Sequence, residues 1–134
     1  MAFFSWEALD RNPELDLSKN SNLKTLNCGF NRIRNLDVSH NAMLTKLVCY
    51  WNILSELRLE QNVDLTELDC SYNSLFALEL HQNPRLTDLH CANNYLMSLH
   101  LEECPDLTEI LQPQSSDEAG RNRKSFAAKL EMFQ

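Results

Sequence analysis

The sequence predicts a solenoid of about four to five stacked coils with short parallel β-strands, a short N-terminal helix and a C-terminal capping helix. Three observations predict it. Cysteine recurs every 21 residues, asparagine follows each cysteine at a fixed distance, and leucine fills fixed positions around both. The cysteines are Cys28, Cys49, Cys70 and Cys91, and the asparagines are Asn31, Asn52, Asn73 and Asn94. A constant period in this range means that each repeat is one coil stacked on the last.

Residues 1–14 are predicted to form an N-terminal cap that contains a short amphipathic helix. Its apolar positions are Phe3, Phe4, Trp6 and Leu9. Ser5 is placed to cap the helix, which should end before Pro13 because the residue before proline disfavours the helical conformation. The first coil of a solenoid exposes an open edge, so these aromatic residues are expected to cover it rather than to contact a ligand.

Residues 15–111 contain the repeats. The first full unit has the spacing Leu23-x-x-Leu26-x-Cys28-x-x-Asn31-x-Ile33, and three further units follow it in phase. The second half of each unit is a weaker copy of the first, so ten- and eleven-residue halves are nested in one period. The leucines should point inward, since burying one contributes roughly 1.5–3 kcal/mol. The asparagines should lie at the bends and pair with backbone groups there. Because the chain has only two glycines, asparagine is also expected to adopt the tight-turn conformation.

This spacing resembles the consensus of leucine-rich repeats, L-x-x-L-x-[LC]-x-x-N-x-L. The nesting resembles the bacterial subclass called IRREKO-type repeats. The resemblance covers residues 15–111 and weakens at the end, where Cys104 occupies an asparagine position and Ile110 begins a coil that does not finish. It implies parallel strands in register at Leu26, Leu47, Leu68 and Leu89. It also implies that the residues flanking these leucines face outward on the sheet.

The C-terminal residues divide into a polar loop at 112–124 and a helix at 125–134. The loop contains proline and glycine among polar residues. In the helix, Phe126, Leu130 and Phe133 share one face. That face is expected to cover the last coil, although it could equally dock on a partner or on a second copy of the chain.

Charge and hydropathy exclude several functions. The net charge is −7, from 19 acidic and 12 basic residues, whereas binding to a nucleic-acid backbone needs a basic surface. No apolar run is long enough to span a membrane, and the N-terminus lacks the features of a signal peptide. The chain is therefore expected in the cytoplasm, or exported without a recognisable signal.

The cysteines are predicted to be reduced core residues, because free cysteine packs as a small apolar side chain and the column alternates with leucine on the inward face. Structural zinc sites usually contain closely spaced cysteine pairs, which this sequence lacks. Neither a metal nor another cofactor is expected. Cys104, at an asparagine position near the end of the repeats, is predicted to be the most exposed thiol.

The candidate binding surface lies just before the asparagine column. Phe30, Trp51 and Tyr72 occupy one position of three successive units, and Tyr50 adjoins Trp51. This position is outside the leucine core, and exposed aromatic residues are common anchors of interfaces. A second interpretation is a structural ladder between coils, worth about 0.2–1 kcal/mol per pair. The two interpretations are compatible.

An acidic group is predicted beside this aromatic column. It comprises Glu67, Asp69, Asp88 and Glu109, with His90 among them. It is expected either to be a solvated sheet surface or to complement a basic partner, which would raise the association rate. A metal site formed by Asp69, Asp88 and His90 is a further, less favoured alternative.

The sequence favours a binding function over catalysis. No nucleophile and base are spaced as in known catalytic motifs, and no phosphate-binding loop is present. We therefore expect a protein-binding module that acts as an adaptor, an inhibitor or immunity-type protein, or an effector. At this length, no room is expected for a separate catalytic domain. The alternative is a structural solenoid that self-associates through its ends or edges.

Overall fold

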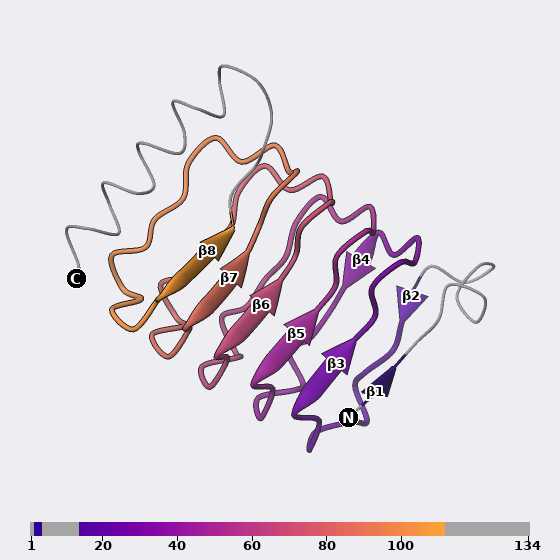
Figure 1. Cartoon of the computed structure of the whole chain (residues 1–134). Coiled ribbons are helices and arrows are strands. Elements are labelled where there is room, and N and C mark those ends of the chain that lie inside the picture. The colour runs from indigo at the N-terminus through magenta and orange to yellow at the C-terminus, as the bar shows by residue number, and fades with distance from the viewer. Residues whose placement is uncertain (1, 4–13, 112–134) are drawn as a thin grey trace.

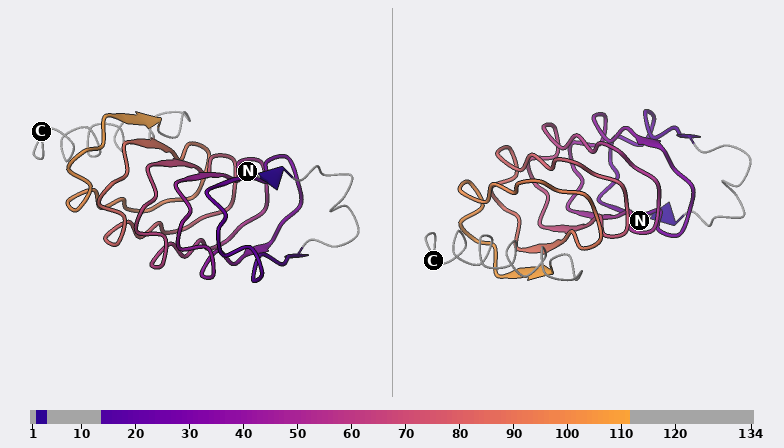
Figure 2. Two further views of the ribbon diagram at one scale, coloured as in Figure 1. Left: turned by 90° about the horizontal axis from the view of Figure 1, so that it is seen from below. Right: turned by 90° about the horizontal axis from the view of Figure 1, so that it is seen from above.

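The computed structural model describes residues 2–3 and 14–111 and contains one main parallel sheet (Figure 1). This sheet has six strands in the order β1-β3-β5-β6-β7-β8, and a second sheet pairs β2 with β4. The strands are β1 (Ala2–Phe3), β2 (Glu14–Leu15), β3 (Thr25–Asn27), β4 (Asn35–Leu36), β5 (Lys46–Val48), β6 (Glu67–Asp69), β7 (Asp88–His90) and β8 (Glu109–Leu111). Figure 2 shows the coils stacked one behind the next. The predicted solenoid is confirmed.

The predicted register is also confirmed. Leu26 pairs with Leu47, Leu47 with Leu68, and Leu68 with Leu89, always in parallel. A threonine just before each of the strands β5 to β8 supports this register, since the hydroxyl of Thr66 donates to the backbone carbonyl of Thr45 at 3.1 Å. Thr45, Thr87 and Thr108 donate in the same way to the coil before them.

The N-terminus differs from the prediction at Phe3, which lies in strand β1 and not in a helix. Strand β1 pairs in parallel with β3, with Ala2 opposite Leu26 and Phe3 opposite Asn27. The backbone groups along the outer edge of β3 favour this pairing, because an open strand edge carries unpaired donors and acceptors. The rest of the predicted N-terminal helix, the polar loop and the C-terminal helix lie outside the described residues. Among the described residues, no helix is long and apolar enough to cross a membrane.

The core is a continuous stack of leucine and cysteine side chains. Leucines from both halves of every coil are buried, and Cys28, Cys49, Cys70 and Cys91 are completely buried and free. Burial raises the pKa of the Cys28 and Cys91 thiols to about 12, and it raises the pKa of Cys49 and Cys70 well above the ordinary value. The predicted role of these cysteines as reduced core residues agrees with this burial.

One asparagine column connects each coil to its neighbours on both sides. The amide nitrogen of Asn52 donates to the carbonyls of Cys28 and Cys49, each at 3.0 Å. The amide oxygen of Asn52 accepts from the backbone N–H of Ile33 at 3.0 Å. Asn73 and Asn94 repeat this arrangement one and two coils further on. One asparagine side chain thus forms hydrogen bonds to three backbone groups at a bend.

The second asparagine column holds the opposite bends. The amide nitrogen of Asn62 donates to the carbonyls of Val38 and Asn41, both at 3.0 Å, and Asn41 and Asn83 bond to the preceding coil in the same way. Within the described residues, the side-chain oxygens of Asn41, Asn62 and Asn83 are buried without a hydrogen-bond partner. The side chains of this column therefore stabilise the bend only as hydrogen-bond donors.

Cys104 continues this second column, and the prediction that it is exposed is wrong. Its side chain is only 2% exposed. The sulfur lies 3.6 Å from the carbonyl oxygen of Leu80 and 3.5 Å from that of Asn83, so the two carbonyls that an asparagine amide would bond share its one proton. Cysteine can replace asparagine here because the position requires a hydrogen-bond donor. A thiol also brings no amide oxygen that would be buried without a partner. Burial raises the pKa of Cys104 to about 11.

Replacing Leu68 with aspartate should abolish cooperative unfolding. Leu68 lies in β6, inside the sheet, and is 2% exposed, so the variant would bury an unpaired charge at a cost of several kcal/mol. Ser55→Asp introduces the same charge at an exposed position and should melt like the wild type. Circular dichroism during heating tests both. A wild-type melting curve for Leu68→Asp would contradict the repeat assignment.

All five thiols should react slowly with a thiol reagent in the native protein and quickly in denaturant. Each is buried with a raised pKa, and the thiolate is the reactive form. Cys104 should still react first, because burial raises its pKa to about 11, less than it raises the pKa of Cys28 or Cys91. Rapid labelling of Cys49 or Cys70 in the folded protein, or a native disulfide found by mass spectrometry, would refute this.

Candidate functional site

The aromatic column is stacked and open to solvent. Phe30, Trp51 and Tyr72 are 56%, 48% and 42% exposed. The ring centroids of Phe30 and Trp51 lie 6.0 Å apart with an interplanar angle of 9°, and those of Trp51 and Tyr72 lie 4.3 Å apart at 7°. Backbone bonds from Phe30 to Tyr50 and from Trp51 to Ser71, both 3.0 Å, hold the rings in register. The predicted stacking is confirmed.

The backbone at this column is left-handed, which the sequence did not reveal. Phe30, Trp51 and Tyr72 have φ angles of 57°, 55° and 55°, and Asn93 has 56° at the same position of the next coil. The tight-turn conformation thus falls one residue before the asparagine column. The left-handed region costs an ordinary side chain about 1–2 kcal/mol, and asparagine is among the residues that tolerate it. Asn93 suits this position, whereas the three aromatic residues do not.

Stacking alone does not account for aromatic residues at these positions. A stacked pair contributes about 0.5–1.5 kcal/mol beyond buried area. Only at the upper end of this range do two stacked pairs offset the strain of three left-handed residues. Stacking alone therefore leaves part of the strain uncompensated, and local backbone strain of this kind is often retained at functional sites.

Tyr50 widens the aromatic surface beside the column. Its ring meets Phe30 edge to face, with centroids 5.0 Å apart and an interplanar angle of 78°. The ring lies over Gly29, where a Cβ atom would be only 2.9 Å from a Tyr50 ring carbon. Glycine at position 29 therefore lets Tyr50 settle against the neighbouring coil. This joins Tyr50 to the column as the sequence predicted.

The charged sheet surface is less uniformly acidic than predicted. Lys46, Glu67 and Asp88 lie side by side in register on β5, β6 and β7. Lys46 Nζ and Glu67 Oε2 form an ion pair of 2.9 Å, in which both side chains are partly exposed. Glu109 continues this row opposite Asp88 on β8. The row is thus basic at one end and acidic beyond it.

Asp69 and His90 form the second row of this surface. Asp69 Oδ2 lies 3.7 Å from His90 Nδ1, while Asp69 Oδ1 accepts from the backbone N–H of Ser71 at 3.1 Å and from its hydroxyl at 2.5 Å. The carboxylate therefore lies between the hydroxyl and the imidazole. This order does not allow His90 to take the Ser71 proton directly, so these residues do not form a catalytic triad.

Two shallow hollows accompany these groups. One, of about 280 Å³, crosses β5, β6 and β7 and is lined by both charged rows. The other, of about 410 Å³, is lined by Phe30, Asn31, Arg32 and Trp51. Within the described residues, no three His, Cys, Asp or Glu side chains are grouped to hold a metal ion. The surface is therefore aromatic on one side, charged on the other and only slightly hollowed.

Sequence reasoning missed a second exposed apolar group. Phe76 and Tyr95 stack with centroids 5.6 Å apart at 25°, and Met97 is highly exposed beside them in sequence. These residues follow the asparagine column, whereas the sequence analysis considered only the position before it. Large apolar residues outside the leucine and cysteine columns were the available signal.

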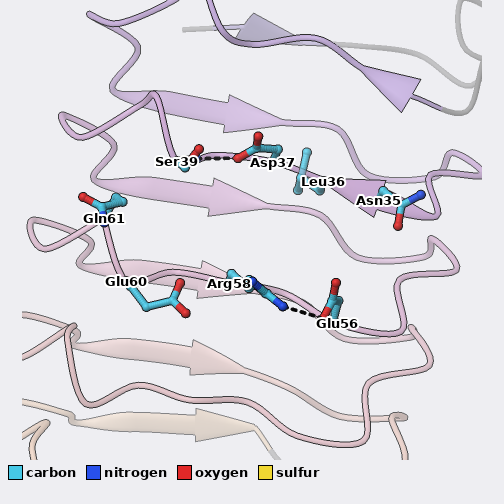
Figure 3. Close-up of a pocket in the computed structure, with 8 residues that line it drawn as sticks. All are labelled: Asn35, Leu36, Asp37, Ser39, Glu56, Arg58, Glu60 and Gln61. Carbon is cyan, nitrogen blue, oxygen red and sulfur yellow. Dashed lines mark hydrogen bonds and ion pairs between the residues drawn. The ribbon is translucent and has the colours of Figure 1, made fainter.

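A further hollow, with a volume of about 740 Å³, lies on the opposite wall of the solenoid. Figure 3 shows residues 35–39 on one coil and residues 56–61 on the next. Its side chains are polar and of mixed charge, with Arg58 3.6 Å from Glu56. Asp37 accepts from Ser39, and these bonds lower its pKa. The residues interact mainly within their own coil, so this hollow is a weaker candidate than the aromatic surface.

Comparison with known proteins supports the repeat assignment. Neither protein-family models nor curated proteins give a match. Among solved structures, the chain is similar to the functional domain of InlJ from Listeria monocytogenes, which includes a cysteine ladder, with 33% identity and a TM-score of 0.61. That similarity covers 75% of this chain and 27% of the chain in that structure.

Two further structures show the same fold. The leucine-rich-repeat protein LIC12759 from Leptospira interrogans is 28% identical over 72% of this chain and 29% of its own, with a TM-score of 0.65. The internalin InlF from Listeria monocytogenes is 21% identical over 85% of this chain and 34% of its own, with a TM-score of 0.68. The chain therefore spans about a quarter to a third of these proteins. It belongs to the bacterial leucine-rich-repeat proteins.

Proposed function

We propose that this chain is a protein-interaction module that binds its partner through the aromatic column and the adjoining sheet surface. The observation that carries the proposal is the column itself. Phe30, Trp51 and Tyr72 are exposed, stacked and held in a backbone conformation that other residues adopt at lower cost. Exposed rings held rigidly lose little entropy on binding, which makes them suitable anchors. Adaptor, inhibitor and effector are all roles that such a module can serve.

Self-association is the second candidate function. Within the described residues, the main sheet ends at β8, which pairs with β7 alone. A strand at the end of a sheet can pair with another chain. A dimer in light scattering that persists when Trp51 is replaced would favour this candidate, and a monomer would favour the binding module.

Trp51→Asn should weaken partner binding by roughly 30-fold or more, because an aromatic anchor typically contributes 2 kcal/mol or more. The melting temperature should change little, since Asn93 shows that asparagine suits this left-handed position. Trp51→Ala should weaken binding similarly. The measurement is the affinity for the protein captured from the source cell, together with a melting curve of each variant.

Phe76→Ala is the matched control for Trp51. It removes an exposed, stacked ring from the second apolar group and should leave binding unchanged. If Trp51→Asn lowers the melting temperature sharply and leaves affinity intact, the column is a structural ladder and the binding surface lies elsewhere.

Asp69→Asn should slow association with a basic partner at low salt and have less effect at high salt. Charges at the rim of an interface act mainly on the association rate, and salt screens them. The turn should survive, because Asn27 at the equivalent position accepts from the backbone N–H of Gly29 at 3.1 Å. Stopped-flow kinetics at two ionic strengths measures this, and Ser55→Asn serves as a control outside the surface. A salt-independent loss would refute the electrostatic role.

A further inference from the structure

We propose that the segment bound by this surface is a basic amphipathic α-helix of the partner, lying along the solenoid axis and across the strands. This inference rests on the proposed function. It adds the conformation, direction and charge of the bound segment.

The spacing of the rings favours a helix. The aromatic column offers one ring per coil, at centroid separations of 6.0 Å and 4.3 Å. An α-helix along the same axis repeats every turn, at about 5.4 Å, which lies between these two values. Residues on one side of an extended strand repeat every ~6.7 Å, which exceeds both values. A helix can therefore place one side chain against each ring, while a strand loses register.

The orientation of the rings favours apolar side chains over flat ligands. Trp51 has Phe30 stacked on one side and Tyr72 on the other, with interplanar angles of 9° and 7°. The ring faces of Trp51 are therefore turned towards its neighbours, and its edge is turned to the partner. A sugar ring or a guanidinium group binds an aromatic residue through its face. A ridge of ring edges instead suits the aliphatic side chains of an amphipathic helix.

The charges beside the column favour basic residues on the flank of the helix. The hollow across β5, β6 and β7 runs along the same axis as the column, and it is lined by Glu67, Asp69 and Asp88. Lys46 is paired with Glu67, and His90 lies 3.7 Å from Asp69, so the acidic excess lies towards Asp88. In the first row, Glu67 and Asp88 lie in register on neighbouring strands about 4.8 Å apart, which is close to one helical turn, and Asp69 lies beside them in the second row. Lysine or arginine one turn apart on the helix would face them.

The length of the column limits the contact. The rings occupy three coils and end at Tyr72, since Asn93 follows in the next coil. Three anchors at positions i, i+4 and i+7 match three rings, as in other grooves that bind helices. The bound helix therefore makes its apolar contacts over about two turns.

Two synthetic peptides of identical composition test the proposal. Each has about 14 residues of leucine, lysine and alanine, arranged with leucine at i, i+4 and i+7 in the first and at alternate positions in the second. Isothermal titration at a concentration where both peptides are monomeric measures affinity, and amide chemical shifts locate the contact. Equal composition separates the effect of conformation from that of charge.

The helical pattern should bind wild type at least ~10-fold more tightly than the alternating pattern. Shifts should centre on Phe30, Tyr50, Trp51 and Tyr72. Trp51→Asn should remove the difference, and Phe76→Ala should retain it. Equal or tighter binding of the alternating peptide, a difference that survives in Trp51→Asn, or no binding of either peptide would overturn the proposal.

Measurements with the natural partner distinguish a failure of this inference from a failure of the proposed function. If Trp51→Asn weakens that partner but a cross-link from position 72 maps to a strand or a loop, the helix is wrong and the binding surface stands. If Trp51→Asn leaves the partner's affinity unchanged, both proposals fail.

Discussion

The bend at each cysteine carbonyl is the constraint on which the other features depend. There the chain turns out of the sheet, and the buried carbonyl of the cysteine would be left without a hydrogen-bond partner. Asn52 supplies it, because its amide nitrogen reaches Cys28 in the coil before and Cys49 in its own coil, while its oxygen takes the N–H of Ile33. A shift of the stacking by one residue would break the two bonds that reach the preceding coil. The asparagine column therefore fixes the register that the leucines alone, as interchangeable apolar groups, specify less strictly.

The same bend determines where the binding surface can form. To bring the asparagine amide inward, the residue before it takes a left-handed conformation, as at Trp51 and Asn93. That residue lies outside the core, and the one-per-coil repeat stacks its side chains along the axis. The asparagine column and the aromatic column beside it are thus both consequences of the same turn. Asparagine at position 93 indicates what the turn itself prefers, and the aromatic residues at positions 30, 51 and 72 depart from that preference.

Most of the fold could be predicted from the sequence because its determinants are periodic. The strand register followed from the leucine column, and the stacking of Phe30, Trp51 and Tyr72 followed from their common position. The left-handed backbone could not be predicted, since aromatic residues rarely adopt it and asparagine stands next to it. The burial of Cys104 was missed because an asparagine position suggested a polar surface, whereas its thiol donates to buried carbonyls. The pairing of Phe3 with β3 joins segments far apart in the sequence. The spacing of apolar residues within the N-terminal segment, from which a helix was predicted, carries no information about such a pairing.

Stability and recognition depend on different residues of the same repeat. Each buried leucine contributes roughly 1.5–3 kcal/mol, and the asparagine amides satisfy groups that would each cost about 1–3 kcal/mol if left unpaired. The column before the asparagine gains little from its stacking by comparison, because the backbone strain there is at least as large. Substitutions there can change the surface without endangering the fold. A chain that repeats its core can therefore vary this one position, and the aromatic residues there form the proposed binding surface.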